Sequence, residues 1–386
     1  MRKTLFWFHF GAGLAAGLLL LFMACSGMLI AFAPQITAWA ELVPSRAASP
    51  TEAAPLPPST LATRAAEALP GGTLGGLAFQ SEPRAAVFAS AARGGGGIWL
   101  DPATGAVLGA SSRARAWLAD VEHWHRWMGE SKRGKQFTHA SALFLLFLVP
   151  TGWLLWIPRG RSAWKRAFLP NLRLKSYAGY RNLHTTFGFW SGAGLLIIGL
   201  TGAVMAYPWA ERGLYGLAGD KAPPRRAEDA GRRPGGKGPS AAANWNPTGL
   251  DSLWSDARRK APDWKAITLR PPRETGKPAT AQIEERGFAS FPRRSRLSAD
   301  PETGAPGKWE PWSAQGKGQR WRGAITPLHT GRGFGWPGQA AAALAAFSLA
   351  FVTWTGILLG IRRIRRPKLA NSAQVQLVEQ VAETNL

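Results

Sequence analysis

Four long apolar stretches constrain the fold of this chain more than any other feature of its sequence. They cover residues 5–33, 137–157, 183–206 and 336–361, and the central part of each lacks Asp, Glu, Lys and Arg. A helix needs about 20 consecutive apolar residues to cross a hydrocarbon core ~30 Å thick. We therefore expect an integral membrane protein with four transmembrane helices in contact with membrane lipid. The first stretch also resembles a signal peptide, but its unusually long apolar run favours an uncleaved helix.

Basic residues predict which side of the membrane each segment faces. The loop 159–182 contains seven Arg and Lys residues and no acid, and basic residues also precede the first span and follow the fourth. The positive-inside rule places these segments, and both termini, in the cytoplasm. The long loops 34–136 and 207–335 then face outward from a bacterial inner membrane. These flanks and a basic outer loop explain much of the net charge of +24, so we expect no nucleic-acid partner.

The spans form an internal repeat that is marked by histidines. His9 and His184 each precede the glycine of a Ser-Gly or Thr-Gly pair by 18 residues, so the first and third spans superimpose at an offset of 175. His125 and His329 each precede the glycine of a Thr-Gly pair by 27 residues, which relates the second and fourth spans at an offset of 204. The chain therefore uses one unit twice, composed of a span, an outer segment and a second span.

The two outer segments share a pattern of predicted elements. A helix over 59–68 precedes strands near 74–80, 85–90 and 97–108, and a helix over 248–261 precedes strands near 264–270, 279–285 and 295–310. DPATGAV at 101–107 and DPETGAP at 300–306 predict the same turn, which starts at Asp-Pro and closes with glycine in the left-handed region. We expect a small α+β domain from each segment. Residues 221–246, rich in Pro, Gly and charge, are expected to form a flexible insertion.

The histidines of the repeat are candidate cofactor ligands. Both copies start on the same side of the membrane, so a pseudo-two-fold axis runs along the membrane normal and equivalent residues lie at the same depth. This symmetry pairs His9 with His184 near the cytoplasmic surface and His125 with His329 near the outer surface. Paired neutral imidazoles on facing helices are the iron ligands of a bis-histidine b-type haem. We therefore predict two haems b, one for each pair, with His139 as an alternative to His125.

Other residues narrow the type of cofactor. Cys25 is the only cysteine and no C-x-x-C-H motif occurs, which excludes covalent c-type attachment and iron–sulfur clusters. Small residues near the histidines would let a flat macrocycle approach the backbone, although helix packing alone also explains them. These residues are Gly11, Gly13, Gly17, Gly188, Gly192 and Gly194. The competing interpretation of each histidine is a hydrated residue at the membrane interface.

The sequence resembles the PepSY-associated transmembrane family, also called iron-regulated membrane proteins, over residues 1–366. The resemblance lies in RKTLFWFHFGAGL at 2–14, WHRWMG at 124–129, TGWLLWIPR at 151–159, RNLHTTFGFW at 181–190, PLHTGRGFGWPGQ at 327–339 and WTGILLGIRR at 354–363. It implies four spans, two PepSY-type outer domains and, as in the family's ferric-siderophore reductases, two b haems that pass electrons outward. The implied iron ligands are His9, His125, His184 and His329. The family does not specify the siderophore or the electron donor, because its members differ.

The sequence thus predicts an internally duplicated, all-α four-helix transmembrane bundle with two extracytoplasmic α+β PepSY-type domains. We expect an inner-membrane di-haem reductase that takes electrons from an unidentified donor and reduces ferric siderophores. One alternative is a non-redox protein that binds or regulates a periplasmic peptidase, and another is an electron-transfer subunit for a separate periplasmic enzyme. The predicted segments are 1–34 (first span), 35–122 (first outer domain), 123–158 (approach and second span), 159–182 (basic loop), 183–207 (third span), 208–326 (second outer domain), 327–362 (approach and fourth span) and 363–386 (tail).

Overall fold

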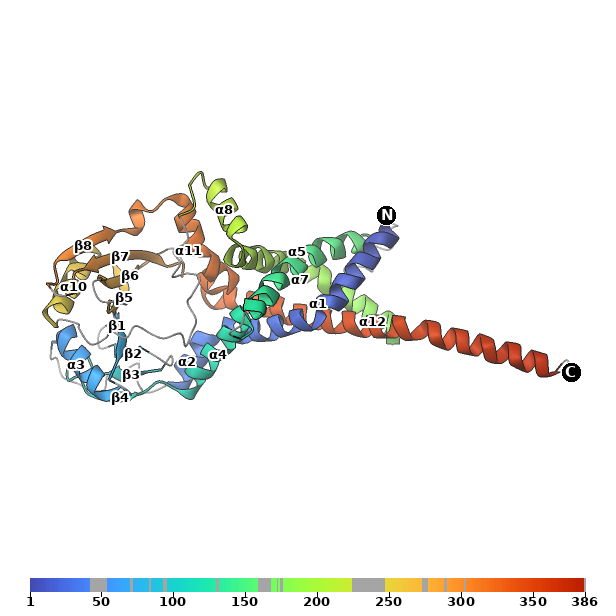
Figure 1. Ribbon diagram of the computed structural model, residues 1–386, viewed down its shortest axis with the longest axis horizontal. Helices are drawn as coiled ribbons and strands as arrows, with labels where there is room; N and C mark the ends of the chain where they lie inside the picture. The colour runs from blue at the N-terminus through green and yellow to red at the C-terminus, as the bar shows by residue number, and fades with distance from the viewer. Residues whose placement is uncertain are drawn as a thin grey trace. The chain divides into compact units, whose positions relative to one another are not determined.

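The computed structural model of the chain (Figure 1) has two compact units. The membrane unit contains Met1–Met28, His125–Tyr207 and Ala340–Leu386, and the sheet unit contains Leu29–Trp124 and Pro208–Gln339. Most of the predicted insertion 221–246 and parts of the basic loop 159–182 lie outside the residues that the structure describes. The described residues are 1–41, 54–69, 72–82, 85–92, 96–129, 132–158, 168–171, 173, 176–223, 247–272, 277–287, 290–301 and 303–384.

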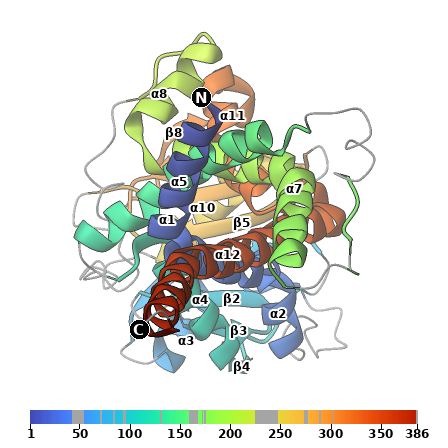
Figure 2. The same cartoon turned by 90° about the vertical axis from the view of Figure 1, so that its right-hand side faces the viewer.

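Four long helices dominate the membrane unit (Figures 1 and 2). They are α1 (Arg2–Ala31), α5 (Lys132–Trp156), α7 (Ser176–Ala206) and α12 (Gly335–Thr384). Within the described residues, each contains a segment that is long and apolar enough to cross a membrane, which confirms the four predicted spans. Large apolar side chains are exposed on their surfaces, including Leu18 at 78 % and Leu344 at 65 %. A continuous apolar surface of this kind is suited to lipid.

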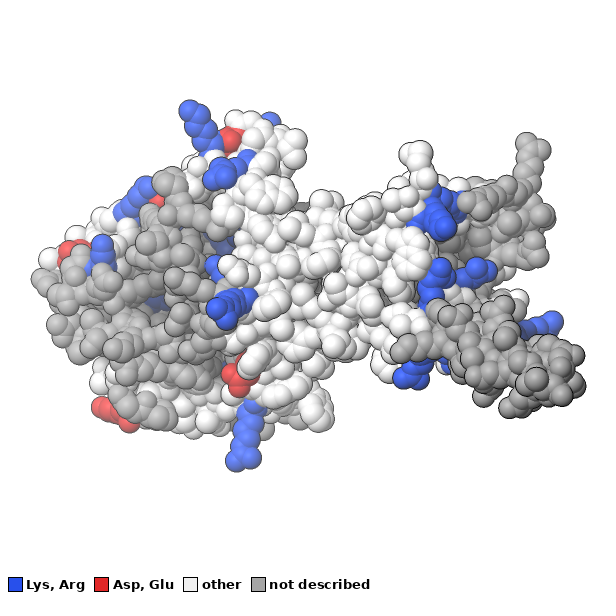
Figure 3. Space-filling view, turned by 45° about the vertical axis from the view of Figure 1, so that its right-hand side comes forward, with Lys and Arg blue, Asp and Glu red and all other residues white. Residues whose placement is uncertain are grey.

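Apolar and charged side chains occupy different parts of the surface of the membrane helices. In Figure 3 the visible surface of the long helices is white over their middle part, and Lys and Arg side chains gather near their ends. Arg2 donates hydrogen bonds of 2.6 Å to the carbonyls of Leu155 and Ile157 and so caps the end of α5. Arg363 of α12 stacks over the rings of Phe6 and Trp7. Basic residues therefore tie the helix ends together at one surface of the membrane unit.

A central cluster of small and aliphatic side chains joins the four long helices. Leu20 and Leu195 contribute to it at the sequence offset of 175, and Leu145 and Leu349 contribute at the offset of 204. Gly192 of α7 lies directly against Trp153 of α5, because a Cβ added at this glycine would come within 2.5 Å of the indole ring. The remaining buried members are Ala16, Ala24, Val149 and Ala345. Close packing of small residues is the usual way for membrane helices to associate.

The sheet unit is built on one antiparallel sheet of eight strands in the order β4-β3-β2-β1-β5-β6-β7-β8. The first four strands come from one outer segment and the last four from the other. Strands β1 and β5 pair at the centre, with Leu77 opposite Leu269. The two segments predicted as separate domains thus contribute to one sheet. The strands are β1 (Leu74–Gln80), β2 (Val87–Ala91), β3 (Gly97–Leu100), β4 (Val107–Ala110), β5 (Trp264–Arg270), β6 (Ala279–Glu285), β7 (Arg293–Ala299) and β8 (Pro306–Glu310).

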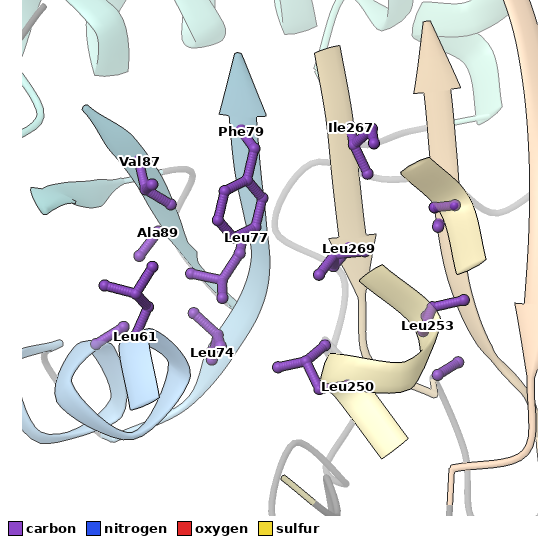
Figure 4. Close-up of a cluster of buried hydrophobic side chains, with 14 of the residues drawn as sticks. Leu61, Leu74, Leu77, Phe79, Val87, Ala89, Leu250, Leu253, Ile267 and Leu269 are labelled. Carbon is purple, nitrogen blue, oxygen red and sulfur yellow. The ribbon is translucent and has the colours of Figure 1, made fainter. Parts of the chain in front are cut away.

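Two helices cover one face of this sheet and enclose its core. α3 (Pro58–Ala68) packs on strands of the first half, and α10 (Pro247–Lys260) packs on strands of the second half. Leu61 of α3 and Leu253 of α10 are almost fully buried, and Figure 4 shows them beside Leu77 and Leu269 of the sheet. The side chains share one continuous cluster, so the core extends across the β1–β5 junction.

The two Asp-Pro motifs form the same turn in the structure. Asp101 accepts hydrogen bonds from the backbone N–H groups of Ala103 and Thr104, and Asp300 accepts one from the N–H of Thr303. Gly105 and Gly304 follow with φ of 71° and 70°, the left-handed region that glycine tolerates best. These turns join β3 to β4 and β7 to β8, so each of the strands predicted over 97–108 and 295–310 is a hairpin.

Shorter helices connect the spans with the sheet. α2 (Ala33–Ala40) and α8 (Pro208–Leu217) follow α1 and α7, and each starts at or beside a proline. α4 (Arg113–Trp127) precedes α5, and α11 (Lys317–His329) precedes α12. The short 3-10 helix η3 (Arg332–Phe334) lies between α11 and α12. Another 3-10 helix, η2 (Trp312–Ala314), lies before α11. His125 and His329 therefore both lie in the last turn of a helix that leads into a span.

Candidate haem site

His9 and His184 lie on the two long helices that the first predicted pair requires. His9 is in the second turn of α1, and His184 is about two turns from the start of α7. Both side chains are half-buried within the membrane unit. Phe10, next to His9, lies against Gly360 of α12, one turn after the Gly356 that His184 contacts. Both imidazoles therefore lie at the same end of the membrane helices.

His9 is held by the neighbouring span through one ring nitrogen. Its Nδ1 lies 2.9 Å from the Oγ1 of Thr151 on α5. The same Oγ1 lies 2.7 Å from the carbonyl oxygen of Phe147, four residues earlier on α5, and 3.1 Å from that of Leu148. The histidine of one span is therefore anchored to the next span along the chain.

His184 is held in a similar way by α12, with one additional partner. Its Nδ1 donates to the carbonyl oxygen of Val352 at 2.9 Å and lies 3.2 Å from the Oγ1 of Thr355. A carbonyl oxygen can only accept, so Nδ1 carries the proton in His184. Thr355 Oγ1 donates in turn to the Phe351 carbonyl at 2.9 Å.

His125 makes the corresponding contact toward α1. Its Nδ1 lies 2.7 Å from the Oγ of Ser26, which lies 2.7 Å from the carbonyl oxygen of Phe22. Three residues later Met128 adopts φ of 43°, a positive value that is uncommon for a residue other than glycine, and Gly129 follows at 90°. This turn ends α4 and fixes the direction from which His125 meets α1.

A glycine follows each hydroxyl residue and lets the imidazole approach the helix. A Cβ added at Gly152 or Gly27 would come within 3.3 Å of the Cε1 of His9 or His125, and one at Gly356 within 3.1 Å of the Cε1 of His184. Any larger residue would push the ring away from the hydroxyl. In each Ser-Gly or Thr-Gly pair that contacts a described histidine, the hydroxyl residue is the hydrogen-bond partner of the imidazole. The glycine has no side chain that would displace the ring.

Glycines one turn after His9 and His184 lie at ordinary contact distance from side chains of neighbouring spans. A Cβ at Gly13 would touch only a Leu148 methyl at 3.8 Å, and one at Gly188 only a Val352 methyl at 3.9 Å. Another turn along, Gly17 and Gly192 are instead closed by side chains of α12 and α5. Close helix packing therefore explains Gly17 and Gly192, and a macrocycle beside Gly13 and Gly188 stays a prediction.

The other histidines differ in their surroundings. His329 ends α11 in the sheet unit, whereas His125 belongs to the membrane unit, so their pairing stays a prediction. The ring of His139, on α5, contacts that of Tyr207 edge-on at 5.5 Å. The Nδ1 of His123 is buried and has no hydrogen-bond partner among the described residues. The assignment of His125 as a ligand, with His139 as the alternative, stays a prediction.

The chemistry of His9 and His184 fits a pair of ligands to one metal. Their Nδ1 atoms are engaged by the protein, which leaves Nε2 as the nitrogen that can bind iron. Among the described residues no three His, Cys, Asp or Glu side chains gather around a common point, so this arrangement differs from a multi-ligand site for a single ion.

Reasoning from the sequence missed the groups that hold the histidines. Ser26, Thr151 and Thr355 marked the repeat, but their contacts with the imidazoles were not predicted, and neither was the Val352 carbonyl. A signal was present, because every span has a Ser-Gly or Thr-Gly pair whose glycine lies 18 residues after a histidine in the first and third spans and 27 residues after one in the second and fourth. That spacing relates residues along the chain, whereas the contacts join different spans.

Comparisons with known proteins agree with this architecture. The family model described as the PepSY-associated TM region matches residues 6–363, nearly the whole chain. A comparison with curated proteins gave no match.

Proposed function

The chain belongs to the PepSY-associated transmembrane family, and on that premise we propose that it is a di-haem b reductase of the bacterial inner membrane. It would move electrons from an unidentified donor on the cytoplasmic side to ferric siderophores on the periplasmic side. Both termini would lie in the cytoplasm, as the distribution of Arg and Lys around the spans indicates. The sheet unit would then be periplasmic.

The observation that carries this proposal is the pair formed by His9 and His184. The two imidazoles lie on different spans at the same end of the membrane helices, and each is engaged through Nδ1 by another span. A hydrated interfacial histidine needs no partner histidine, whereas a bis-histidine haem requires one on a facing helix.

The protein's own residues would hold and orient the cofactor. His9 and His184 would bind the iron of the first haem through Nε2, and the repeat assigns His125 and His329 to the second, with His139 as the alternative to His125. A bound b-type haem would supply one-electron transfer at its iron. The apolar side chains of the four spans would exclude water around it.

Surface charge and the chemistry of iron release both favour an anionic ferric chelate as the substrate. Hard-oxygen chelators bind Fe(II) more weakly than Fe(III), because the lower charge weakens the attraction, so reduction frees the metal. Strand β7 exposes Arg293, Arg294 and Arg296 on the sheet unit, and Arg293 also stacks over Trp312. Such a basic surface would raise the local concentration of an anionic chelate.

A single-turnover experiment tests the proposed reaction. The purified protein is reduced with dithionite in the absence of oxygen, freed of excess reductant and mixed with a ferric hydroxamate siderophore. We expect haem reoxidation together with the appearance of Fe(II), captured by an Fe(II)-specific colour reagent, with one ferric ion reduced per electron.

Two outcomes would contradict the proposal and would favour the alternatives. Haem that is reduced normally but stays reduced with every ferric chelate would favour an electron-transfer subunit for another periplasmic enzyme. Colourless protein that still binds a periplasmic peptidase would favour the non-redox role.

A further inference from the structure

The hydroxyl partners of the histidines permit an inference about proton positions, which rests on the proposed function only for its consequence at the iron. A threonine or serine hydroxyl has one proton to donate and can accept at its lone pairs. Thr151 Oγ1 lies 2.7 Å from the Phe147 carbonyl oxygen, which can only accept, so the hydroxyl proton is directed there. The contact of 2.9 Å with His9 must then be a bond that His9 donates.

The same assignment of donors and acceptors applies to the other described partners of the histidines. Ser26 Oγ lies 2.7 Å from the Phe22 carbonyl oxygen, so it accepts from His125 Nδ1 at 2.7 Å. For His184 the direction is settled without the hydroxyl, because its Nδ1 lies within hydrogen-bonding distance of the Val352 carbonyl oxygen, which can only accept. All three imidazoles therefore carry their proton on Nδ1 and present the lone pair of Nε2.

We infer that Thr151 and Ser26 are positioning residues that hold His9 and His125 in the Nδ1–H tautomer required for ligation through Nε2. An acceptor at Nδ1–H also increases the basicity of Nε2, which stabilises ferric iron more than ferrous iron. Removing the acceptor therefore weakens ferric haem binding and raises the midpoint potential. Thr151 has the larger role at its site, because among the described residues it alone accepts from His9, whereas His184 keeps the Val352 carbonyl when Thr355 is changed.

This difference between two ligands of one iron supplies a matched pair of variants. Thr151→Val removes the acceptor of His9 with little change in volume, and Thr355→Val makes the same change where a carbonyl remains. Thr151→Ser restores the hydroxyl. Ser191→Ala is a control for loss of a span hydroxyl, since among the described residues Ser191 bonds only to its own helix, at the Phe187 carbonyl.

The first measurement is the haem affinity and midpoint potential of the holoprotein variants. Loss of a group that orients a metal ligand typically lowers metal affinity about 10–100-fold, and we expect this for Thr151→Val. Its potential should rise by about 59 mV for each tenfold by which ferric affinity falls more than ferrous affinity. Thr355→Val, Thr151→Ser and Ser191→Ala should remain close to wild type. Equal effects of Thr151→Val and Thr355→Val, or no effect of either, would overturn the inference.

A second measurement does not need haem. Long-range ¹H–¹⁵N correlation spectra of protein labelled at histidine report which ring nitrogen carries the proton. We expect the Nδ1–H tautomer for His9 in wild type and a shift toward Nε2–H in Thr151→Val. If the protein binds no haem but shows this change, the function fails and the tautomer assignment holds. An Nε2–H signal for His9 in wild type would refute the assignment itself.

Discussion

At the scale of single residues, the buried carboxylate of Glu41 is held by several hydrogen-bond donors. Glu41, just after α2, is only 7 % exposed, and it accepts hydrogen bonds from the backbone and hydroxyl of Ser112 and from two nitrogens of Arg115. Arg115 in turn stacks over Phe88 of the sheet at 4.7 Å. Burial alone would raise the pKa of Glu41, but the hydrogen bonds from Arg115 and Ser112 outweigh it and lower the pKa below its ordinary value.

This set of partners predicts an acid-sensitive contribution to stability. Because the folded pKa of Glu41 is lowered, its contribution is fully present above about pH 4.3, the ordinary value for glutamate, and is lost as the pH falls through the folded value. Glu41→Gln should lower the free energy of unfolding by about 1–3 kcal/mol at pH 7. The difference from wild type should shrink as the pH falls below 4. Denaturant unfolding followed by tryptophan fluorescence at several pH values measures this, and a pH-independent difference would argue against the assignment.

At the scale of elements, the central pairing of β1 with β5 determines how the sheet unit folds. Leu77 and Leu269 are opposite each other, and neither is exposed. The core cluster crosses this junction and includes residues of both covering helices. The two halves of the sheet should therefore be stabilised as one cooperative unit.

Substitutions at the junction test that coupling. Leu77→Ala and Leu269→Ala should each lower stability by about 2–5 kcal/mol, since each leaves a cavity in the shared core. Both halves should lose protection from amide hydrogen exchange together. Val107→Ala on β4 removes methyl groups from a side chain that is 50 % exposed, and it should have little effect. Loss of protection confined to the half that carries the substitution would show two independent domains.

Sequence patterns predicted the elements of this unit better than their assembly. The strands over 74–80, 264–270 and 279–285 have the predicted bounds. Alternation of apolar residues and turn motifs are local signals, so they locate strands and hairpins. Pairing between β1 and β5 joins residues far apart along the chain. The residues of either strand do not predict which other strand pairs with it. The hydroxyl partners of the histidines were missed for the same reason.

At the scale of the whole molecule, the proposed reductase function rests on the four spans and on the predicted histidine pairs. The spans were predictable because their length and apolar character are set by the bilayer itself. The histidine pairs were predictable as a hypothesis because a repeat matches residues across the chain. Neither the spans nor the repeat alone implies a cofactor, and the proposed function requires that haem is bound.

Haem content per polypeptide tests that claim most directly. The protein is purified from haem-sufficient membranes, and its haem is determined by pyridine haemochrome absorbance for wild type, His9→Ala, His184→Ala and the control His123→Ala. The account predicts two b-type haems per chain in wild type and in the His123 variant, and loss of the same single haem in each of the other two. Wild-type protein without haem, or His9→Ala and His184→Ala variants with normal haem content, would contradict it.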